Sequence, residues 1–330
     1  MLPMLRRAPS ATLTTLLLTT LALPFACGEP GPGTDEPPLD EVAYREELAE
    51  WQAKRQAGMS NPDGWRALVG LDWLEPGETT VGGGVDNDIV LPTDNAPPRL
   101  GTFTVVRDAE NETRDVRFRP AEGVEVTVEG EPVTGEISLG TDLEEATTVL
   151  EAGSLTVHVI EREDESGTRL ALRTRDRNHP RLSEPPELSF YPIDPTWRLA
   201  ARFEPYDPPR RISIVNVLGM ISEEPCPGAL VFEKDGTEHR IDALESGDEL
   251  FLIFGDQTNC KGTYCAGRYL YTAGPGGDGA TVVLDLNRAY NPPCAFTELA
   301  TCPLPPPQNK LALAVTAGER YEKGYAPGHP

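Results

Sequence analysis

The hydrophobic pattern of the chain begins with a helical period. Within residues 39–56, Tyr44, Leu48 and Trp51 recur at helical spacing between charged residues, and Asp40 is placed to cap the first turn. The pattern therefore predicts one amphipathic helix that packs against the rest of the chain.

An alternating pattern replaces the helical one after the turn at residues 61–64. Short apolar or alternating runs recur there, separated by Gly, Pro, Asn and Asp, as is typical of antiparallel β sandwiches and barrels. No second long helical period follows, which disfavours an α/β architecture. The predicted strands are residues 102–107, 124–128, 154–161, 168–173, 211–218, 229–233, 249–254, 268–272 and 280–287.

A proline-rich stretch at residues 180–195 separates two β units. We predict a helix in residues 39–60, a β sandwich in residues 61–178 and a second antiparallel β unit in residues 179–330. The prolines within residues 303–307 cannot continue a central strand, so the second unit is expected to end in proline-rich loops. The predicted fold class is mainly β with one N-terminal amphipathic helix.

The first residues have the order of a secretory signal. Arg6 and Arg7 precede an apolar stretch that ends in small residues at Ala26, and this stretch is too short for a membrane span of about 20 residues. We therefore predict that residues 1–26 are a signal peptide and that the protein is exported.

Cys27 follows the small residue and begins a Gly-, Pro- and acid-rich tract at residues 27–38. This arrangement resembles the lipobox and tether of bacterial lipoproteins. It predicts lipidation of Cys27 and anchoring in the cell envelope. The alternative is an ordinary signal peptide followed by a soluble periplasmic or secreted protein.

The charge balance restricts the partners. The sequence has 29 Lys and Arg residues against 53 Asp and Glu residues, a formal net charge of −24. Such a chain repels nucleic acid phosphates and anionic headgroups, so we expect no nucleic acid partner and membrane contact only through the lipid anchor. No nucleotide-binding glycine pattern and no spaced Cys or His ligands occur, so neither a cofactor nor a metal is predicted.

The remaining cysteines all lie in the last third of the sequence. Export permits disulfides, but the sequence alone fixes no connectivity. The short, turn-rich intervals favour Cys260 with Cys265 and Cys294 with Cys302, which leaves Cys226 free. A zinc site is the weaker alternative.

The strand predicted at residues 280–287 places polar groups at its end. Alternation puts Asp285 and Asn287 on one face, immediately before Tyr290 and Asn291. A carboxylate and amides are therefore expected to leave the strand on the same side.

Arg268 from a neighbouring strand and Asp256 from the preceding turn would complete a polar pocket if they converge on Asp285. Such a pocket can hold a sugar, an amino acid or a carboxylate by directional hydrogen bonds. Alternatively, Asp256 and Asp285 act as acid and base in a hydrolase of a carbohydrate-like substrate. In a purely structural protein, the same groups would tie down the proline-rich loops.

A second polar group ends the first β unit. Arg173, Arg175 and Asp176 are expected to form an ion network between the two units, with ligand binding as the alternative. No Gly-x-Ser-x-Gly or His-Glu-x-x-His motif occurs, so the sequence leaves open whether the protein is an enzyme.

The first β unit resembles forkhead-associated domains. Residues 77–83 and 86–91 are similar to the opening of that fold, and residues 128–133 and 150–155 to its later hairpins. The resemblance implies a forkhead-associated-like β sandwich. The family's phosphothreonine readers include an arginine after the glycine that corresponds to Gly83 and a Ser-x-x-His turn. Both are missing here, which implies the fold without phosphopeptide binding.

Most of the chain after the tether is similar to the bacterial family called domain of unknown function 1684. The runs that carry this resemblance are residues 64–74, 262–268, 285–296 and 301–309. The family implies no established activity. Cys260 and Cys265 do not belong to its pattern, which implies an added disulfide in this member.

These observations predict an envelope lipoprotein of uncharacterised role. Its second β unit is expected to bind a small polar ligand or a protein partner, and the hydrolase and the structural protein remain as alternatives.

Overall fold

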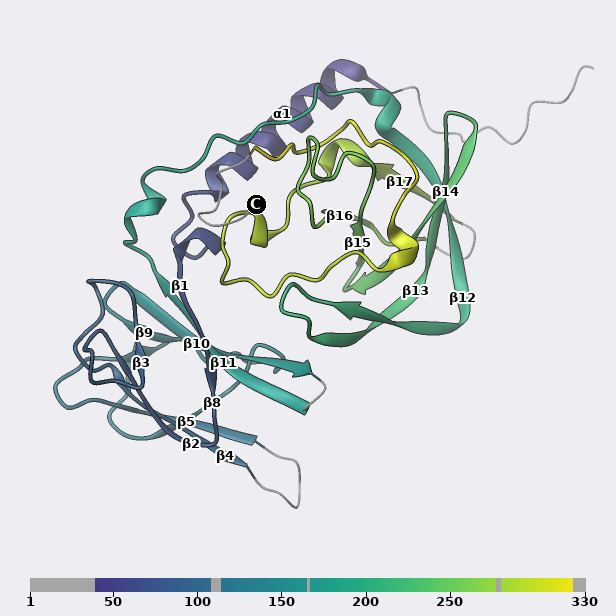
Figure 1. Cartoon of the computed structure of the whole chain (residues 1–330). Helices are drawn as coiled ribbons and strands as arrows, with labels where there is room; N and C mark the ends of the chain where they lie inside the picture. Colours follow the sequence, from purple (N-terminus) through teal and green to yellow (C-terminus); the bar gives the residue numbers. More distant parts are fainter. Residues whose placement is uncertain (1–38, 108–113, 165–166, 277–279, 323–330) are drawn as a thin grey trace, which may run out of the picture. The chain divides into compact units, whose positions relative to one another are not determined.

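The computed structural model describes residues 39–107, 114–164, 167–276 and 280–322 (Figure 1). The chain divides into the units Met1–Leu39 and Asp40–Pro330, and every element below belongs to the second. The predicted signal peptide and tether, including Cys27, lie outside the described residues. No helix in the described ranges is both long and apolar enough to cross a membrane.

The predicted amphipathic helix is α1 (Glu41–Gly58). The Asp40 carboxylate accepts hydrogen bonds from two backbone N–H groups of the first turn, which satisfies donors that have no partner within the helix. Tyr44 and Leu48 are buried, so the predicted face packs against the body of the protein. The predicted helix and its cap are confirmed.

Two sheets form the β sandwich. The first sheet has the order β1 (Leu68–Leu74), β11 (Gly167–Asp176), β10 (Leu155–Asp164), β9 (Leu150–Ala152), β6 (Thr127–Val128) and β7 (Glu131–Pro132). The second has the order β3 (Ile89–Val90), β2 (Gly77–Gly82), β4 (Gly101–Arg107), β5 (Arg114–Pro120) and β8 (Ile137–Leu139). Side chains of both sheets, such as Phe103 and Leu172, share one apolar core.

The strand predicted at residues 124–128 is wrong in its extent. Only Thr127 and Val128 pair with neighbouring strands, whereas Val126 contributes a buried side chain without belonging to a strand. A short apolar run therefore marked a core position but overstated the hydrogen-bonded length.

Strand alternation gives the first sheet a polar outer face. Leu170 and Leu172 of β11 point into the sandwich core. Because successive residues of a strand point to opposite faces, Arg173 and Arg175 lie on the other face of the sheet, away from that core. His158 of β10 pairs with Arg173 across the strands. This face carries positive charge toward the proline-rich loops.

The C-terminal sheet is antiparallel throughout, as predicted. Its order is β16 (Arg268–Ala273), β15 (Glu249–Phe254), β14 (Thr237–Ser246), β13 (Ile221–Lys234), β12 (Arg198–Val215) and β17 (Thr281–Asp285). The predicted set lacked β14, whose exposed positions are mostly charged and whose buried positions include His239 and Asp242. Polar residues at buried positions hid its alternation.

The chain after β17 contains no strand among its described residues and turns through short 3-10 helices. They are η4 (Leu286–Arg288), η5 (Pro293–Ala295) and η6 (Pro307–Asn309), and earlier ones are η1 (Trp65–Ala67), η2 (Pro180–Leu182) and η3 (Pro195–Trp197). The strand predicted at residues 280–287 ends at Asp285, because the Asp285 carboxylate accepts from the Asn287 N–H and caps η4.

Asn309 shows how this irregular segment is held. Its side-chain NH2 donates to the carbonyl oxygens of Asp242 (2.9 Å) and Ile253 (3.0 Å), and its Oδ1 accepts from the Asp242 N–H (2.8 Å). One buried amide thus replaces the ladder hydrogen bonds that a strand would have made.

Candidate functional site

The residues predicted to form one polar pocket lie in separate places. Asp256 and Arg268 meet as predicted, with 2.8 Å between Oδ2 and Nη2, but both side chains are fully buried. Arg268 also donates to the carbonyl oxygens of Val315 and Ala317. The Asp256–Arg268 ion pair is therefore shielded from solvent, and Arg268 holds the C-terminal segment in place through these two carbonyl groups.

Asp285 and Asn287 form a second buried group that holds α1. Asp285 Oδ1 accepts from the Tyr44 hydroxyl (2.8 Å), and the Asn287 side chain donates to the same hydroxyl (3.0 Å). Burial, then the Asp285 charge, raises the pKa of Tyr44, so its hydroxyl stays protonated and donates. Asp256 and Asp285 border different hollows, so the carboxylate pair of the hydrolase alternative is not assembled.

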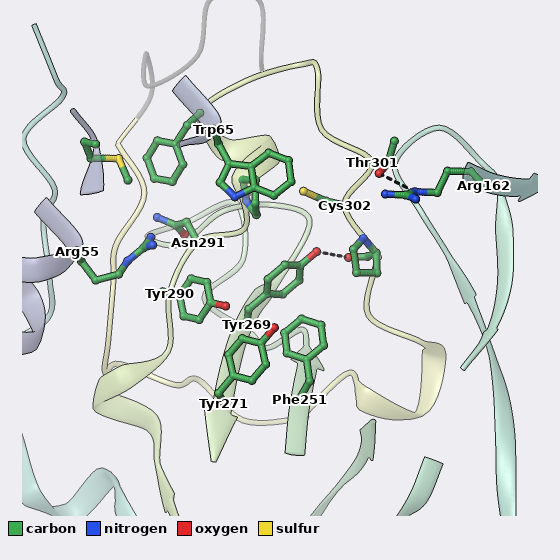
Figure 2. Close-up of a pocket in the computed structure, with 14 residues that line it drawn as sticks. Arg55, Trp65, Arg162, Phe251, Tyr269, Tyr271, Tyr290, Asn291, Thr301 and Cys302 are labelled. Atoms are coloured by element: carbon green, nitrogen blue, oxygen red, sulfur yellow. Dashed lines mark hydrogen bonds between the residues drawn. The ribbon is translucent and has the colours of Figure 1, made fainter. Parts of the chain in front are cut away.

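Tyr290 and Asn291 line an open cavity of about 430 Å³, which we call the aromatic pocket. This volume lies within the range of small-molecule sites, about 300 to 1,000 Å³. Figure 2 shows Arg55 and Arg162 entering the view from opposite sides, with aromatic side chains between them. Its lining residues are Arg55, Met59, Trp65, Arg162, Phe251, Tyr269, Tyr271, Tyr290, Asn291, Pro293, Phe296, Thr301, Cys302 and Pro303.

Neighbouring strands supply the aromatic wall. The Phe251 ring of β15 stacks on Tyr271 of β16, with centroids 4.6 Å apart and planes at 18°, and meets Tyr269 edge-on at 5.0 Å. Tyr269 donates its hydroxyl to the Pro303 carbonyl (2.7 Å). Burial raises the pKa of Tyr269 and of Tyr290, so both remain neutral phenols. The wall is therefore formed by neutral aromatic rings, and the Tyr269 hydroxyl in it is held by a hydrogen bond.

One end of the pocket has an unused hydrogen-bond acceptor. The Asn291 side-chain NH2 donates to Glu319 Oε1 and to the Arg320 carbonyl, each at 2.9 Å. Its Oδ1 is buried and has no hydrogen-bond partner. Arg55 pairs with Glu319 at 2.8 Å and lies over the Tyr290 ring at 4.7 Å. Asn291 Oδ1 can therefore accept from a ligand, whereas the charge of Arg55 is already compensated.

The other end is positively charged. Arg162 and Arg173 both donate to the Thr301 hydroxyl oxygen, at 3.2 and 3.4 Å. Asp142 compensates Arg162 with an ion pair of 2.8 Å. Within the described ranges, Arg173 has no carboxylate partner, and its Nε is buried without an acceptor. Burial, then the charge of Arg162, lowers the pKa of Arg173 to about 10.

The predicted network of Arg173, Arg175 and Asp176 is not formed. Asp176 lies on the opposite face of β11 and accepts from Thr93, Asn95 and Ser154. Arg175 contacts His158 Nδ1 at 3.4 Å instead. Strand alternation separates Asp176 from Arg175, because neighbouring residues of a strand point to opposite faces.

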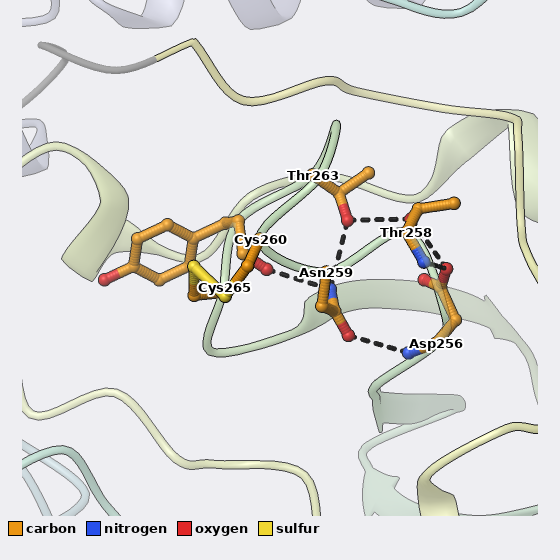
Figure 3. The surroundings of a disulfide bond; sticks show 7 residues. Asp256, Thr258, Asn259, Cys260, Thr263 and Cys265 are labelled. Carbon is orange, nitrogen blue, oxygen red and sulfur yellow. Dashed lines mark hydrogen bonds between the residues drawn. A yellow bond between two sulfur atoms is a disulfide. The ribbon is translucent and has the colours of Figure 1, made fainter. Parts of the chain in front are cut away.

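The cysteines differ from the prediction in one pair. Cys260 and Cys265 form a disulfide, which Figure 3 shows beside Asn259. Cys294 and Cys302 are free thiols, as is Cys226. The Cys302 sulfur accepts from the Cys294 N–H at 3.1 Å, so the short interval brings the residues together without a covalent bond.

Several pocket residues were absent from the prediction, chiefly Arg55, Trp65, Phe251, Tyr271 and Thr301. Trp65 and Thr301 lie in runs that carry the family resemblance, which was a usable signal. Phe251 and Tyr271 pair across β15 and β16, and their burial is only partial. Paired aromatic residues on an incompletely buried strand face were the second signal.

Two solved structures are similar to parts of this chain. An uncharacterised protein of Haloarcula marismortui, solved by NMR, is 31% identical over 42% of this chain and 77% of its own, with a TM-score of 0.36. Mycobacterium tuberculosis EmbR, solved with a low-affinity phosphopeptide, is 16% identical over 42% of this chain and 32% of its own, with a TM-score of 0.20. No curated protein matches the sequence.

The family comparison identifies the C-terminal part. Residues 185–320 match the family described as "Protein of unknown function (DUF1684)". This range contains the C-terminal sheet and the loop residues Tyr290, Asn291 and Thr301 of the aromatic pocket. The predicted resemblance is therefore confirmed for residues 185–320, the segment that matches the DUF1684 family.

Proposed function

We propose that the protein binds a small organic ligand in the aromatic pocket and does so as a lipid-anchored protein of the bacterial cell envelope. The observation that carries the binding role is the pocket itself, in which an aromatic wall stands beside the unused acceptor Asn291 Oδ1. An apolar wall with a few fixed polar groups is the usual composition of a small-molecule site.

The wall favours a ligand with a flat or ring-shaped body. Phe251 and Tyr271 are already stacked, and Tyr271 remains 41% exposed. A further ring can extend this stack, and each aromatic contact is worth about 0.5 to 1.5 kcal/mol. The unpaired Asn291 Oδ1 can in addition accept from a hydroxyl or an amide N–H where the same ligand carries one.

A thermal-shift panel tests the binding role. The probes are ring-bearing carboxylates and their primary amides: benzoate and benzamide, 2-naphthoate and 2-naphthamide, cyclohexanecarboxylate and its amide, and glucuronate and glucuronamide. At least one probe should raise the Tm of the protein. Titration should then show that Tyr271→Ala weakens that probe by up to about tenfold.

The matched control is Tyr206→Ala, because Tyr206 is also a partly exposed tyrosine but does not line the pocket. It should leave probe affinity unchanged. Failure of every probe to bind the wild-type protein, or equal weakening by both variants, would contradict a binding role for this pocket.

The envelope location rests on the leader and on Cys27. Expressed in a bacterium with its leader, the full chain should fractionate with membranes, and Cys27→Ser should move it to the soluble fraction. If Cys27→Ser stays with the membranes, the lipid anchor is refuted while the binding role is unaffected.

A further inference from the structure

We propose that Arg173, with Arg162 and Thr301, forms an anion subsite at one end of the aromatic pocket, and that the ligand is a ring-bearing carboxylate held there. This inference rests on the proposed binding role and specifies its ligand. The residues come from β10, β11 and the loop after η5, which meet at the Thr301 hydroxyl.

At Thr301, two arginine side chains donate to one hydroxyl oxygen, which is a weak acceptor for two charged groups. Two guanidinium groups share one neutral hydroxyl oxygen, and the contact from Arg173 is 3.4 Å long. Hydrogen bonds of N–H to oxygen are usually 2.7 to 3.2 Å. A carboxylate would offer two charged oxygens to the same donors, which is the acceptor that guanidinium groups bind best.

Charge balance points the same way. Arg55 is paired with Glu319 and Arg162 with Asp142, so the charged residues on the pocket lining are compensated. Arg173 lies behind them and is 5% exposed, and none of the described carboxylates forms an ion pair with it. An unpaired charge at such a site is unfavourable unless an anion reaches it. Arg173 contacts Thr301 and Trp65 of the pocket lining, so a carboxylate bound beside them would supply a counter-charge for its guanidinium.

The neighbouring surfaces direct the anion into the aromatic pocket. Arg162 and Thr301 also border a second hollow, but its lining includes Glu161, Glu163 and Glu223. That hollow repels a carboxylate. On the aromatic side, the Arg173 guanidinium lies 5.2 Å from the Trp65 ring centre, and Trp65 lines the aromatic pocket. A ring stacked within the pocket can therefore carry its carboxylate toward Thr301.

The experiment compares each carboxylate with its amide, which has the same shape without the charge. In wild-type protein the carboxylate of a binding pair should bind at least about tenfold more tightly than the amide, the difference expected for one charge-assisted contact. Arg173→Met should reduce this ratio to about 1 to 3, while amide affinity stays the same. Arg173→Lys should retain part of the preference.

Control and folding readouts make the outcomes separable. Arg119→Gln removes an exposed arginine of β5 and should leave the ratio unchanged. Arg173→Met should have a Tm no lower than that of the wild type, because it removes an unpaired buried charge. If carboxylate and amide bind equally to wild type, the anion subsite is refuted while the binding role stands. A preference that survives Arg173→Met overturns the assignment to Arg173, and failure of every probe refutes the binding role itself.

Discussion

Breaking the buried pair of Asp256 and Arg268 is the sharpest test of how the C-terminal segment is held. Asp256→Asn keeps the size of the side chain and its Oδ1, which accepts from Thr258 and Val315. The new amide NH2 then replaces Oδ2 and faces a guanidinium donor, 2.8 Å away in the wild type. The substitution therefore leaves a fully buried arginine without a counter-charge.

The expected loss is large. Removing one partner of a buried ion pair costs about 3 to 5 kcal/mol of unfolding free energy. Since domains are stable by about 5 to 15 kcal/mol, this is a substantial part of the total. With a urea m-value near 3 kcal/mol/M, the unfolding midpoint should fall by about 1 to 2 M.

The matched control is Asp86→Asn, the same chemical change in an exposed pair. Asp86 lies 3.6 Å from Arg99, and its side chain is 81% exposed. Solvent screens such a pair, so the expected loss is under about 0.5 kcal/mol. Adding Arg268→Met to Asp256→Asn should recover part of the loss, because the uncompensated charge is then gone. Equal, small losses for Asp256→Asn and the control would refute this account of the pair.

Three further predictions follow from buried polar groups. Tyr44→Phe should cost about 1 to 3 kcal/mol in urea unfolding, because it removes a buried hydrogen bond to the charged Asp285 carboxylate and an acceptor of the Asn287 side chain; an unchanged midpoint would contradict this. Cys226, Cys294 and Cys302 should resist a thiol reagent in the folded protein and all react after unfolding without reductant, whereas reaction of Cys226 alone would indicate a second disulfide. Burial lowers the pKa of His158 from 6.5 to about 4, so the unfolded chain takes up more protons between these values and stability should fall as pH falls through that window. His158→Gln should lose less stability there than wild type in parallel urea titrations, and equal losses would contradict the assignment.

The helix and most strands could be predicted because their information is local. Tyr44 and Leu48 show the period of α1, and the short apolar run in residues 249–254 predicted β15 with its observed bounds. β14 was missed because His239 and Asp242 occupy buried positions where apolar residues were expected. Hydrophobic alternation fails where a sheet buries polar residues against an irregular loop.

The candidate site was harder because its contacts are distant in sequence. Tyr44 and Asp285 are 241 residues apart, and Arg55 and Glu319 are 264 apart. Sequence spacing identified Asp285 and Asn287 as neighbours but gave no indication that the Tyr44 hydroxyl of the helix would hydrogen-bond to both of them. Residue type alone therefore did not distinguish a ligand group from a structural one.

The buried contacts also explain how an irregular loop can form a defined wall of the aromatic pocket. The loop has no ladder of backbone hydrogen bonds, so buried side chains must fix it. The Asn291 side-chain NH2 donates to Glu319 and to the Arg320 carbonyl, and these two hydrogen bonds fix the direction of Oδ1. Arg55 reaches Glu319 from α1, so the helix, the C-terminal segment and the pocket wall are held by one network. A wall that is already rigid loses little entropy when a ligand binds. The buried polar residues therefore position the groups that line the aromatic pocket.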